Sequence, residues 1–125
     1  MVAAVADWRV EAAAQKIKKD GSGEPPALAL IENPDILANV ALHRQRPRLV
    51  IGFAAETHET LAHAARKRVR KAADWIVAND VSGDVLGGDS NRVYIVTANG
   101  FEEWEQQPKA EVAARLAQRI ADALA

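Results

Sequence analysis

Four short apolar runs recur along the chain, and each one ends in polar residues. The runs cover residues 2–6, 28–31, 49–55 and 75–78. Because their apolar positions do not alternate with polar ones, they are typical of strands covered on both faces, as in a parallel sheet. The first polar residues after the runs are, in order, Asp7, Glu32, Glu56 and Asn79. Ligands of open α/β sheets bind beyond the carboxyl ends of the strands, so we expect a ligand edge here.

A first helix is expected directly after the second run. Asn33 can cap free backbone N–H groups, and Pro34 suits the first helical position because its fixed φ is already helical. Apolar residues then share one helix face, and a basic run that contains Pro47 ends the helix. That face consists of Ile36, Leu37, Val40 and Ala41.

A second helix is expected between the third and fourth runs, over about residues 58–73, with Thr57 as its cap. Apolar residues recur in it at spacings of three and four, which is typical of a buried stripe. The stripe consists of Leu61, Ala65, Val69 and Ala72. Helices that alternate with such strands predict an α/β fold, with a Rossmann-like, mostly parallel sheet and flanking helices.

Two further segments do not follow this alternation of strands and helices. Residues 10–27 join a helix-forming, lysine-bearing start to a Gly- and Pro-rich stretch, which predicts a basic flap at the ligand edge. Residues 81–106 contain a loop, an alternating run and a turn signal at Asn99, which together predict a C-terminal antiparallel arm. A terminal helix is expected over about residues 108–125. Its apolar face consists of Val112, Leu116, Ile120 and Leu124.

The composition narrows the possible classes of function. The chain has 125 residues, the length of one domain or of part of one. Its 16 Lys and Arg nearly balance 17 Asp and Glu, so no overall charge favours nucleic acid or a membrane surface. Cysteine is absent, which excludes disulfides, zinc thiolates and thiol catalysis and fits a reducing cytoplasm. No apolar stretch approaches the ~20 residues that cross a bilayer.

Polar residues supply several candidate sites, each with a plain structural explanation beside it. His43, His58 and His63 lie on expected helix surfaces or starts, and we interpret them as solvated side chains. The helix start at Asn33 exposes N–H groups that suit a phosphate, although simple capping explains it as well. Lys16 and its lysine neighbours form a basic flap, and surface lysines are usually only solvated.

The basic run at residues 66–71 leaves three interpretations open. Cations near the C-terminus of a helix are favoured by the helix macrodipole. A nucleic-acid surface is a second interpretation, but the chain has few aromatic residues to stack bases and no basic net charge. A triphosphate needs several local cations, and Lys67 and Lys71 would present theirs from one helix face.

Six short motifs occur in a fixed order and spacing. They are AAVADWR from Ala3, KIKK from Lys16, NPDIL from Asn33, GFAAET from Gly52, KRVRK from Lys67 and ANDV from Ala78. Together they resemble the phosphopantothenate–cysteine ligase domain of bacterial flavoproteins of coenzyme A synthesis. The resemblance covers about residues 3–97, most of the chain.

This resemblance implies a ligase that uses CTP with Mg²⁺. CTP would activate the carboxylate of 4′-phosphopantothenate as an acyl-cytidylate, and the amine of cysteine would then displace CMP. Lys16, in the flap, is the expected catalytic residue, whereas the metal ligands stay unassigned. The residues that match the family's CTP contacts are Asp7, Lys16, Pro34, Asp35, Ile36, Leu37, Phe53, Lys67 and Lys71.

The resemblance also implies missing parts. The family's N-terminal ligase segment, and the flavin-dependent decarboxylase domain that is commonly fused upstream, have no counterpart in this sequence. We therefore expect residues 1–125 to be the C-terminal part of the ligase domain, truncated at the N-terminus. Such a fragment would carry most of the CTP site and would be inactive alone.

The expected partners follow from the same resemblance. Family members are dimers, so we expect a homodimer in which Val93, Tyr94 and Ile95 of the arm pack against a second copy. The substrates are expected to be 4′-phosphopantothenate and cysteine, with no nucleic-acid or membrane partner and a cytoplasmic location. A non-catalytic nucleotide-binding or interaction module of Rossmann-like fold is the alternative.

Overall fold

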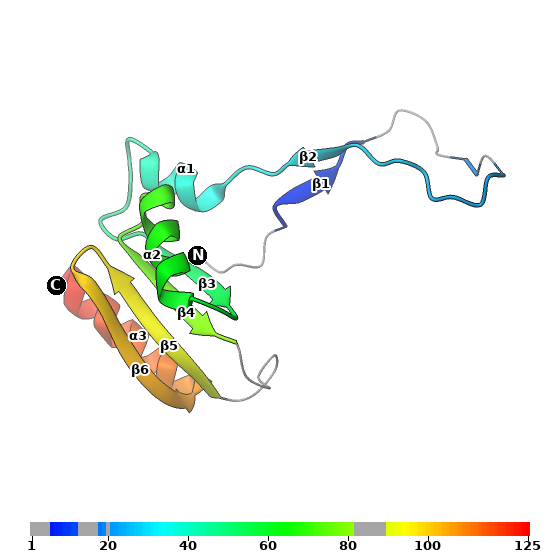
Figure 1. Ribbon diagram of the computed structural model, residues 1–125. Helices are drawn as coiled ribbons and strands as arrows, with labels where there is room; N and C mark the ends of the chain where they lie inside the picture. The colour runs from blue at the N-terminus through cyan, green and yellow to red at the C-terminus, as the bar shows by residue number, and fades with distance from the viewer. Residues whose placement is uncertain (1–5, 13–17, 20, 82–89) are drawn as a thin grey trace. The chain divides into compact units, whose positions relative to one another are not determined.

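The computed structural model describes residues 6–12, 18–19, 21–81 and 90–125 (Figure 1). The chain divides into two compact units, one of residues 4–35 and the other mainly of residues 36–125. Each unit has its own sheet. Every buried hydrophobic side chain among the described residues belongs to the larger unit.

The larger unit is built on a four-stranded sheet with the order β3–β4–β5–β6. The strands are β3 (Ile51–Glu56), β4 (Trp75–Asp80), β5 (Ser90–Thr97) and β6 (Gly100–Pro108). β3 and β4 are parallel, whereas the β4–β5 and β5–β6 pairs are antiparallel. Helix α2 (Thr60–Lys71) connects the two parallel strands. The predicted α/β, Rossmann-like fold with flanking helices is confirmed. The expectation of a mostly parallel sheet is wrong for the described strands, because the antiparallel arm continues the same sheet and makes it mixed.

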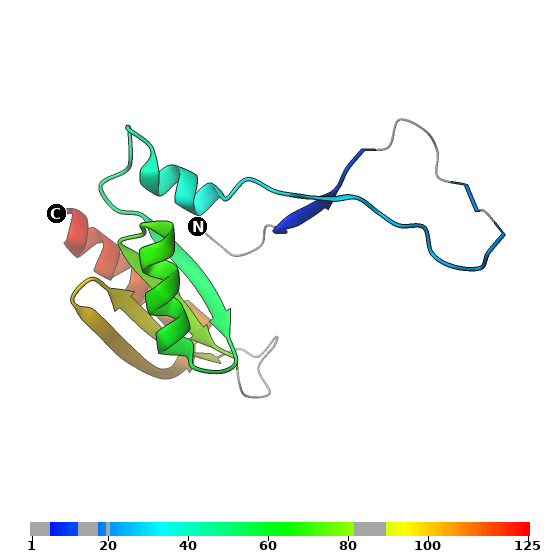
Figure 2. The same cartoon turned by 45° about the horizontal axis from the view of Figure 1, so that its top comes forward.

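One face of this sheet is covered by α1 (Ile36–Leu42) and α2 (Figure 2). Small side chains let the helices approach closely, and Ala64 of α2 is fully buried. Gly52 marks the tightest point, since a Cβ there would lie 2.5 Å from Leu37 Cδ2 and 2.9 Å from Ile76 Cδ1. Because protein interiors are close-packed, even a methyl group at this position would force the side chains of Leu37 and Ile76 to shift.

The other face is covered by α3 (Lys109–Leu124), which lies behind the sheet in Figure 1. Two arginines of α3 lie over buried tryptophan rings. The guanidinium carbon of Arg115 is 4.3 Å from the ring centre of Trp104, and that of Arg119 is 4.9 Å from the ring centre of Trp75. These cation–π contacts add to the apolar packing of the helix.

The arm does not present the predicted side chains to a second copy. Val93 and Ile95 are 2% and 0% exposed, because they lie beneath α3 within this chain. Tyr94 points to the opposite face and packs, half-buried, against the core there. The prediction that these residues contact a second copy is therefore wrong as regards Val93 and Ile95. The homodimer itself stays a prediction.

Helix α2 differs from the prediction at its start and in its buried stripe. Glu59, with φ 46°, occupies the N-cap position instead of Thr57, and it makes no side-chain capping bond. The stripe is confirmed at Leu61 and Ala72, which pack partly buried on the core, but it is wrong at Ala65, which is exposed, and at Val69, which is 70% exposed. The cause is that α2 packs over β3, β4 and β5 through Ala64, whose small side chain allows the closest approach.

Arg46 and Asp74 form a polar hub that links the amino ends of β3 and β4 to the ends of α1 and α2. Arg46 donates from Nη2 to Asp74 Oδ2 at 2.8 Å and from Nε to the carbonyl of Ala41 at 2.9 Å. The same Asp74 oxygen accepts the backbone N–H of Val50 at 2.7 Å. A third bond from Arg46 reaches the carbonyl of Ala72, just after α2. The basic run that is expected to end α1 therefore also contacts the residue that follows α2.

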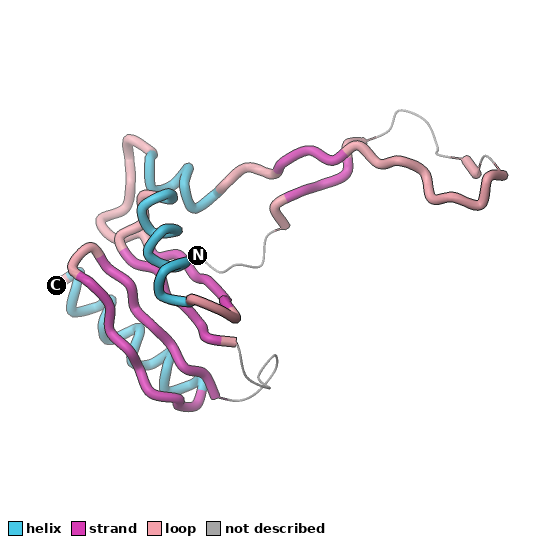
Figure 3. The backbone as a smooth tube through the Cα atoms, in the orientation of Figure 1, coloured by secondary structure: helices cyan, strands magenta, loops and turns pink. Residues whose placement is uncertain are grey.

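The smaller unit contains a two-stranded antiparallel ribbon of β1 (Trp8–Val10) and β2 (Leu30–Glu32), drawn as strands in Figure 3. All of its strand residues are exposed. The prediction that residues 28–31 form a buried parallel strand is therefore wrong, because the described segment pairs only with β1. The run predicted at residues 2–6 lies outside the described residues, except for Ala6.

Asn33 serves this ribbon and does not cap α1. Its Nδ2 donates to the carbonyl of Ala6 at 2.7 Å, and its Oδ1 accepts a bond of 2.9 Å from Arg9. Its backbone N–H bonds to the carbonyl of Asp7 at 2.7 Å. The side chain that was expected to satisfy a helix start instead joins the two strand segments.

Candidate functional site

The residues that the resemblance assigned to CTP are divided between the two units. The smaller unit holds Asp7, Pro34 and Asp35, and the larger unit holds Ile36, Leu37, Phe53, Lys67 and Lys71. Lys16, the expected catalytic residue, lies outside the described residues. The larger unit therefore carries most of the described candidate site.

Lys67 and Phe53 meet at β3, one of the two edge strands of the described four-stranded sheet. Nζ of Lys67 donates a hydrogen bond of 2.7 Å to the backbone carbonyl of Phe53. The two residues are 14 positions apart, and they meet because α2 runs back along the strand that precedes it. An ammonium group has three donors, so it can hold a carbonyl and an anion together. Within the larger unit, this contact joins two of the residues that the resemblance assigned to CTP.

The ring of Phe53 lies on the other side of the sheet from Lys67. It packs half-buried against the cluster beneath α3, whereas α2 covers the opposite face. The structure thus brings Lys67 to the backbone of Phe53 and not to its ring. Leu37 is also turned inward, 6% exposed, and packs on Gly52. Its predicted contact with a nucleotide can involve its backbone but not its buried side chain.

Lys71, the last residue of α2, lies one helical turn beyond Lys67 and is half-buried. Arg68, the residue after Lys67, donates to the carbonyl of Ala73 at 3.3 Å. Two basic side chains of the run, those of Lys67 and Arg68, therefore bond to carbonyls of this chain. That arrangement differs from an open nucleic-acid surface, whose cations point toward solvent.

Polar side chains gather at the carboxyl ends of β3 and β4, as the strand pattern predicted. Glu56 and Asp80 stand opposite each other as the last residues of the two parallel strands. Arg92 of β5 is in turn opposite Asp80. Beside them, the side-chain carbonyl of Asn79 is buried and has no hydrogen-bond partner among the described residues. This edge therefore offers carbonyl and carboxylate acceptors.

His63 of α2 also lies at this edge, where it contacts two glutamates and is more than the solvated side chain expected from its sequence position. Its Nδ1 lies 3.2 Å from Oε2 of Glu56, and its Nε2 lies 3.9 Å from Oε2 of Glu59. The signal that could have found the pair is positional. Glu56 ends a strand, and His63 lies in the first turn of the helix that folds back over it.

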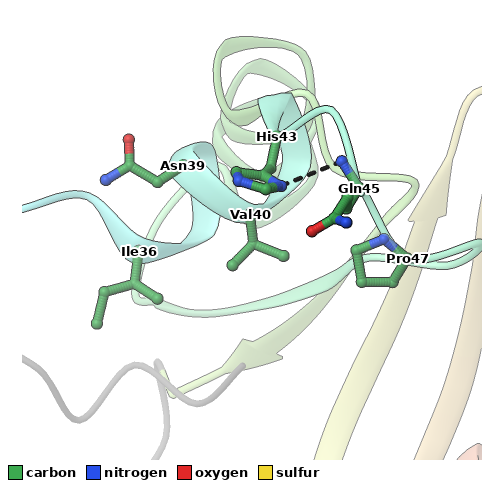
Figure 4. Close-up of a pocket in the computed structure, with 6 residues that line it drawn as sticks. All are labelled: Ile36, Asn39, Val40, His43, Gln45 and Pro47. Carbon is green, nitrogen blue, oxygen red and sulfur yellow. Dashed lines mark hydrogen bonds between the residues drawn. The ribbon is translucent and has the colours of Figure 1, made fainter.

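A shallow cavity of about 420 Å³ lies beside α1, and Ile36 is the candidate-site residue at its rim (Figure 4). Within it, Nδ1 of His43 accepts a bond of 3.1 Å from the backbone N–H of Gln45. The imidazole thus closes the turn after α1. The residues lining the cavity are Ile36, Asn39, Val40, His43, Gln45 and Pro47.

In the smaller unit, Asp7 precedes β1, and Pro34 and Asp35 follow β2. The antiparallel pairing of these strands brings Asp7 next to Asn33, immediately before the Pro34–Asp35 pair. The flap lysines Lys18 and Lys19 line a cavity of about 570 Å³ together with the Gly- and Pro-rich stretch that follows them in the flap. This unit therefore holds a carboxylate, a helix-start turn and a basic loop.

Among residues 6–12, 18–19, 21–81 and 90–125, no three His, Asp or Glu side chains come close enough together to hold a metal ion. In the same part of the chain, no helix has the length and hydrophobicity to cross a membrane.

The comparison with known families decides where the chain belongs. A family model described as the DNA/pantothenate metabolism flavoprotein C-terminal domain matches residues 1–124. The chain belongs to this family. The family resemblance inferred from the six motifs is therefore confirmed.

Curated relatives of the chain are considerably longer than it is. It is 43% identical over 120 residues to the coenzyme A biosynthesis bifunctional protein CoaBC of Haemophilus influenzae, covering 94% of this chain and 30% of that protein. To the protein of the same name from Escherichia coli it is 41% identical over 102 residues, covering 78% of this chain and 25% of that one. The chain thus spans less than a third of the length of these two relatives.

Solved structures share the fold. The crystal structure of the C-terminal domain of a CoaBC protein superposes with a TM-score of 0.69 and 30% identity, over 98% of this chain and 52% of that one. A DNA/pantothenate metabolism flavoprotein from Streptococcus pneumoniae gives a TM-score of 0.66 at 25% identity, over 84% of this chain and 45% of that one.

Proposed function

We propose that this chain carries part of a CTP-dependent phosphopantothenate–cysteine ligase and serves coenzyme A biosynthesis. The names of its relatives support the pathway. The hydrogen bond from Lys67 to the carbonyl of Phe53 is the observation that carries the nucleotide site. It joins two residues that the family pattern assigns to CTP, on a strand that ends at the expected ligand edge.

The proposed reaction has two steps. A carboxylate oxygen of 4′-phosphopantothenate attacks the α-phosphorus of CTP, and pyrophosphate leaves. The amine of cysteine then attacks the acyl carbon, CMP leaves, and the nitrogen loses a proton as the amide forms. The first step joins two anions, so it needs cations that are already in position. Lys67 and Lys71 would hold the triphosphate, and Lys16 would act at the reacting phosphate.

Mg²⁺ would accompany the triphosphate in this proposal. Mg²⁺ keeps several waters and is usually bound by substrate phosphates with one or two carboxylates, not by a cage of protein ligands. The described residues fit such a nucleotide-borne ion, because Glu56 and Asp80 place carboxylates at the ends of the two parallel strands. The ion would supply positive charge at the phosphates.

The test is a reconstitution with the native full-length protein that carries this sequence. The protein is mixed with 4′-phosphopantothenate, cysteine, Mg²⁺ and one nucleoside triphosphate at a time, and amide and pyrophosphate are measured. We expect CTP to support far more product than ATP, GTP or UTP. CTP binding without any product would favour a non-catalytic nucleotide-binding module. If the protein bound no nucleotide at all, the proposed function would be wrong, and the remaining alternative would be an interaction module.

The isolated chain of 125 residues is the second arm of this test. We expect it to form no detectable amide under the same conditions. Turnover equal to that of the full-length protein would show that these residues alone suffice for catalysis.

A further inference from the structure

We infer that Glu56, held by His63, accepts hydrogen bonds from the ribose hydroxyls of the nucleotide and so selects ribonucleotides over 2′-deoxyribonucleotides. This inference rests on the proposed nucleotide function. Glu56 is the last residue of β3, at the carboxyl edge where ligands of open α/β sheets bind. An ionised carboxylate only accepts hydrogen bonds, and sugar hydroxyls are donors that it can bind.

The bond with His63 gives Glu56 a fixed orientation. Nδ1 of His63 is 3.2 Å from Oε2 of Glu56, and the two side chains are 39% and 29% exposed. The carboxylate is therefore partly shielded and still reachable by a ligand. A carboxylate offers about four acceptor positions, so one bond to an imidazole orients the group without exhausting it. Orientation is what a group that selects among hydroxyls requires.

The carboxylate at the end of β3 and the lysines of α2 follow one another in the same order as the ribose and the phosphates of a nucleotide. His63 and Lys67 lie one turn apart on the helix and contact Glu56 and Phe53, which are three positions apart on β3. Three strand residues separate Glu56 from Phe53 by roughly 10 Å. Lys71 lies a further turn of about 5.4 Å along the helix. The array thus has an acceptor at the carboxyl end of the strand and cations along the rest.

A nucleoside triphosphate has the complementary order, with hydroxyl donors on its ribose and negative charge on its phosphates. A His63–Glu56 pair that only tied α2 to β3 would give the protein no preference between nucleotides with and without the 2′-hydroxyl. The ribose is therefore expected at the carboxyl end of β3, with the phosphates toward Lys67. Glu59, whose side chain is 75% exposed and lies on the other nitrogen of His63 at 3.9 Å, should take no part.

The experiment compares CTP with 2′-deoxy-CTP. Dissociation constants are measured by isothermal titration calorimetry on the native full-length protein and on Glu56→Ala, His63→Gln and Glu59→Gln. Native protein should bind CTP about 10- to 100-fold more tightly than 2′-deoxy-CTP, the factor expected for hydrogen bonds to a charged group. Glu56→Ala should bring the two affinities within about threefold, mainly by weakening CTP. His63→Gln should lose part of the preference, and Glu59→Gln should keep it.

Retained binding of 2′-deoxy-CTP by Glu56→Ala shows that the variant is folded, because that ligand lacks the hydroxyl in question. A native preference that survives in Glu56→Ala overturns the inference and leaves the nucleotide site intact. A native protein that binds neither nucleotide overturns the proposed function together with this inference. Equal affinity of the native protein for both nucleotides overturns the ribose assignment alone.

Discussion

Two tryptophans show how differently the two units of this chain are built. Trp104 of β6 is 1% exposed, whereas Trp8 of β1 is 57% exposed. Leucines differ in the same way, since Leu37 is 6% exposed and Leu30 is 56% exposed. Apolar residues in a strand or helix are therefore not buried by their own hydrophobicity. They are buried only when a second layer of structure covers them.

The larger unit supplies that second layer twice. α1 and α2 cover one face of its sheet, and α3 covers the other. The ribbon of the smaller unit has only two strands, and such a ribbon is marginally stable by itself. Its described side chains are linked mainly by polar bonds around Asn33. This contrast predicts where mutations matter for folding and where they matter for function.

The sharpest test of the contrast is to remove each tryptophan. Trp104→Ala should lower the free energy of unfolding by about 3–5 kcal/mol, because it opens a cavity in the core beneath Arg115. Trp8→Ala should change it by less than about 0.5 kcal/mol, as for other exposed positions. Urea unfolding followed by far-UV circular dichroism measures both. Equal losses in the two variants would contradict the contrast.

The second test extends the contrast to the lysines in the native full-length protein. Lys67 and Lys71 belong to a helix packed on the core, so their charges are held before the nucleotide arrives. Lys67→Ala or Lys71→Ala should weaken CTP binding by roughly 1.5–3 kcal/mol, measured by calorimetry. Lys16→Gln should instead slow the formation or conversion of the acyl-cytidylate at saturating CTP, measured in a single turnover.

The lysine prediction can fail in a specific way. If Lys16→Gln weakened CTP binding and left the single-turnover rate untouched, the division into binding and chemistry would be wrong. Lys109→Ala, at the start of α3, is the matched control for loss of a lysine charge and should alter neither quantity.

A third test concerns the polar hub of the larger unit. Asp74→Ala should cost about 1–2 kcal/mol of unfolding free energy, because it removes the acceptor of Arg46 and of the Val50 N–H. The partial exposure of the pair, 30% and 34%, keeps the value at the lower end. Glu103→Ala is the control; it breaks an exposed pair with Arg92 at 3.8 Å and an exposed 3.4 Å bond from the Tyr94 hydroxyl, and it should cost below about 1 kcal/mol. Equal losses of unfolding free energy in the two variants would contradict the view that the polar hub stabilises the fold more than an exposed ion pair does.

The smallest effect on global stability is expected from Asn33→Ala. It removes the bonds to Ala6 and Arg9 in the smaller unit, so unfolding of the larger unit should change by less than about 0.5 kcal/mol. Hydrogen exchange of the Trp8–Val10 amides should nevertheless become faster, because these bonds join the segments on either side of the ribbon. Loss of global stability without faster exchange would reverse our view of the smaller unit.

The sequence alone determined the elements whose patterns are local. It predicted β4, the hairpin of β5 and β6 and the helix after Pro108, because a strand run, a turn signal and a helical stripe each lie within a few residues. It also predicted the family, because six motifs in order are specific even when each one is weak. Three of the four apolar residues assigned to the last helix pack on the core as expected, namely Val112, Leu116 and Ile120.

Only the tertiary structure decided which surfaces meet. It gave residues 28–31 an antiparallel partner in place of a parallel sheet, covered Val93 and Ile95 with α3 in place of a second copy, and turned the ring of Phe53 away from Lys67. It also brought His63 to Glu56. Periodicity reports that a residue has an apolar or polar face, but the partner of that face comes from a distant part of the chain. Burial, register and the contacts of a site depend on that partner, so they became visible only once the strands and helices were packed.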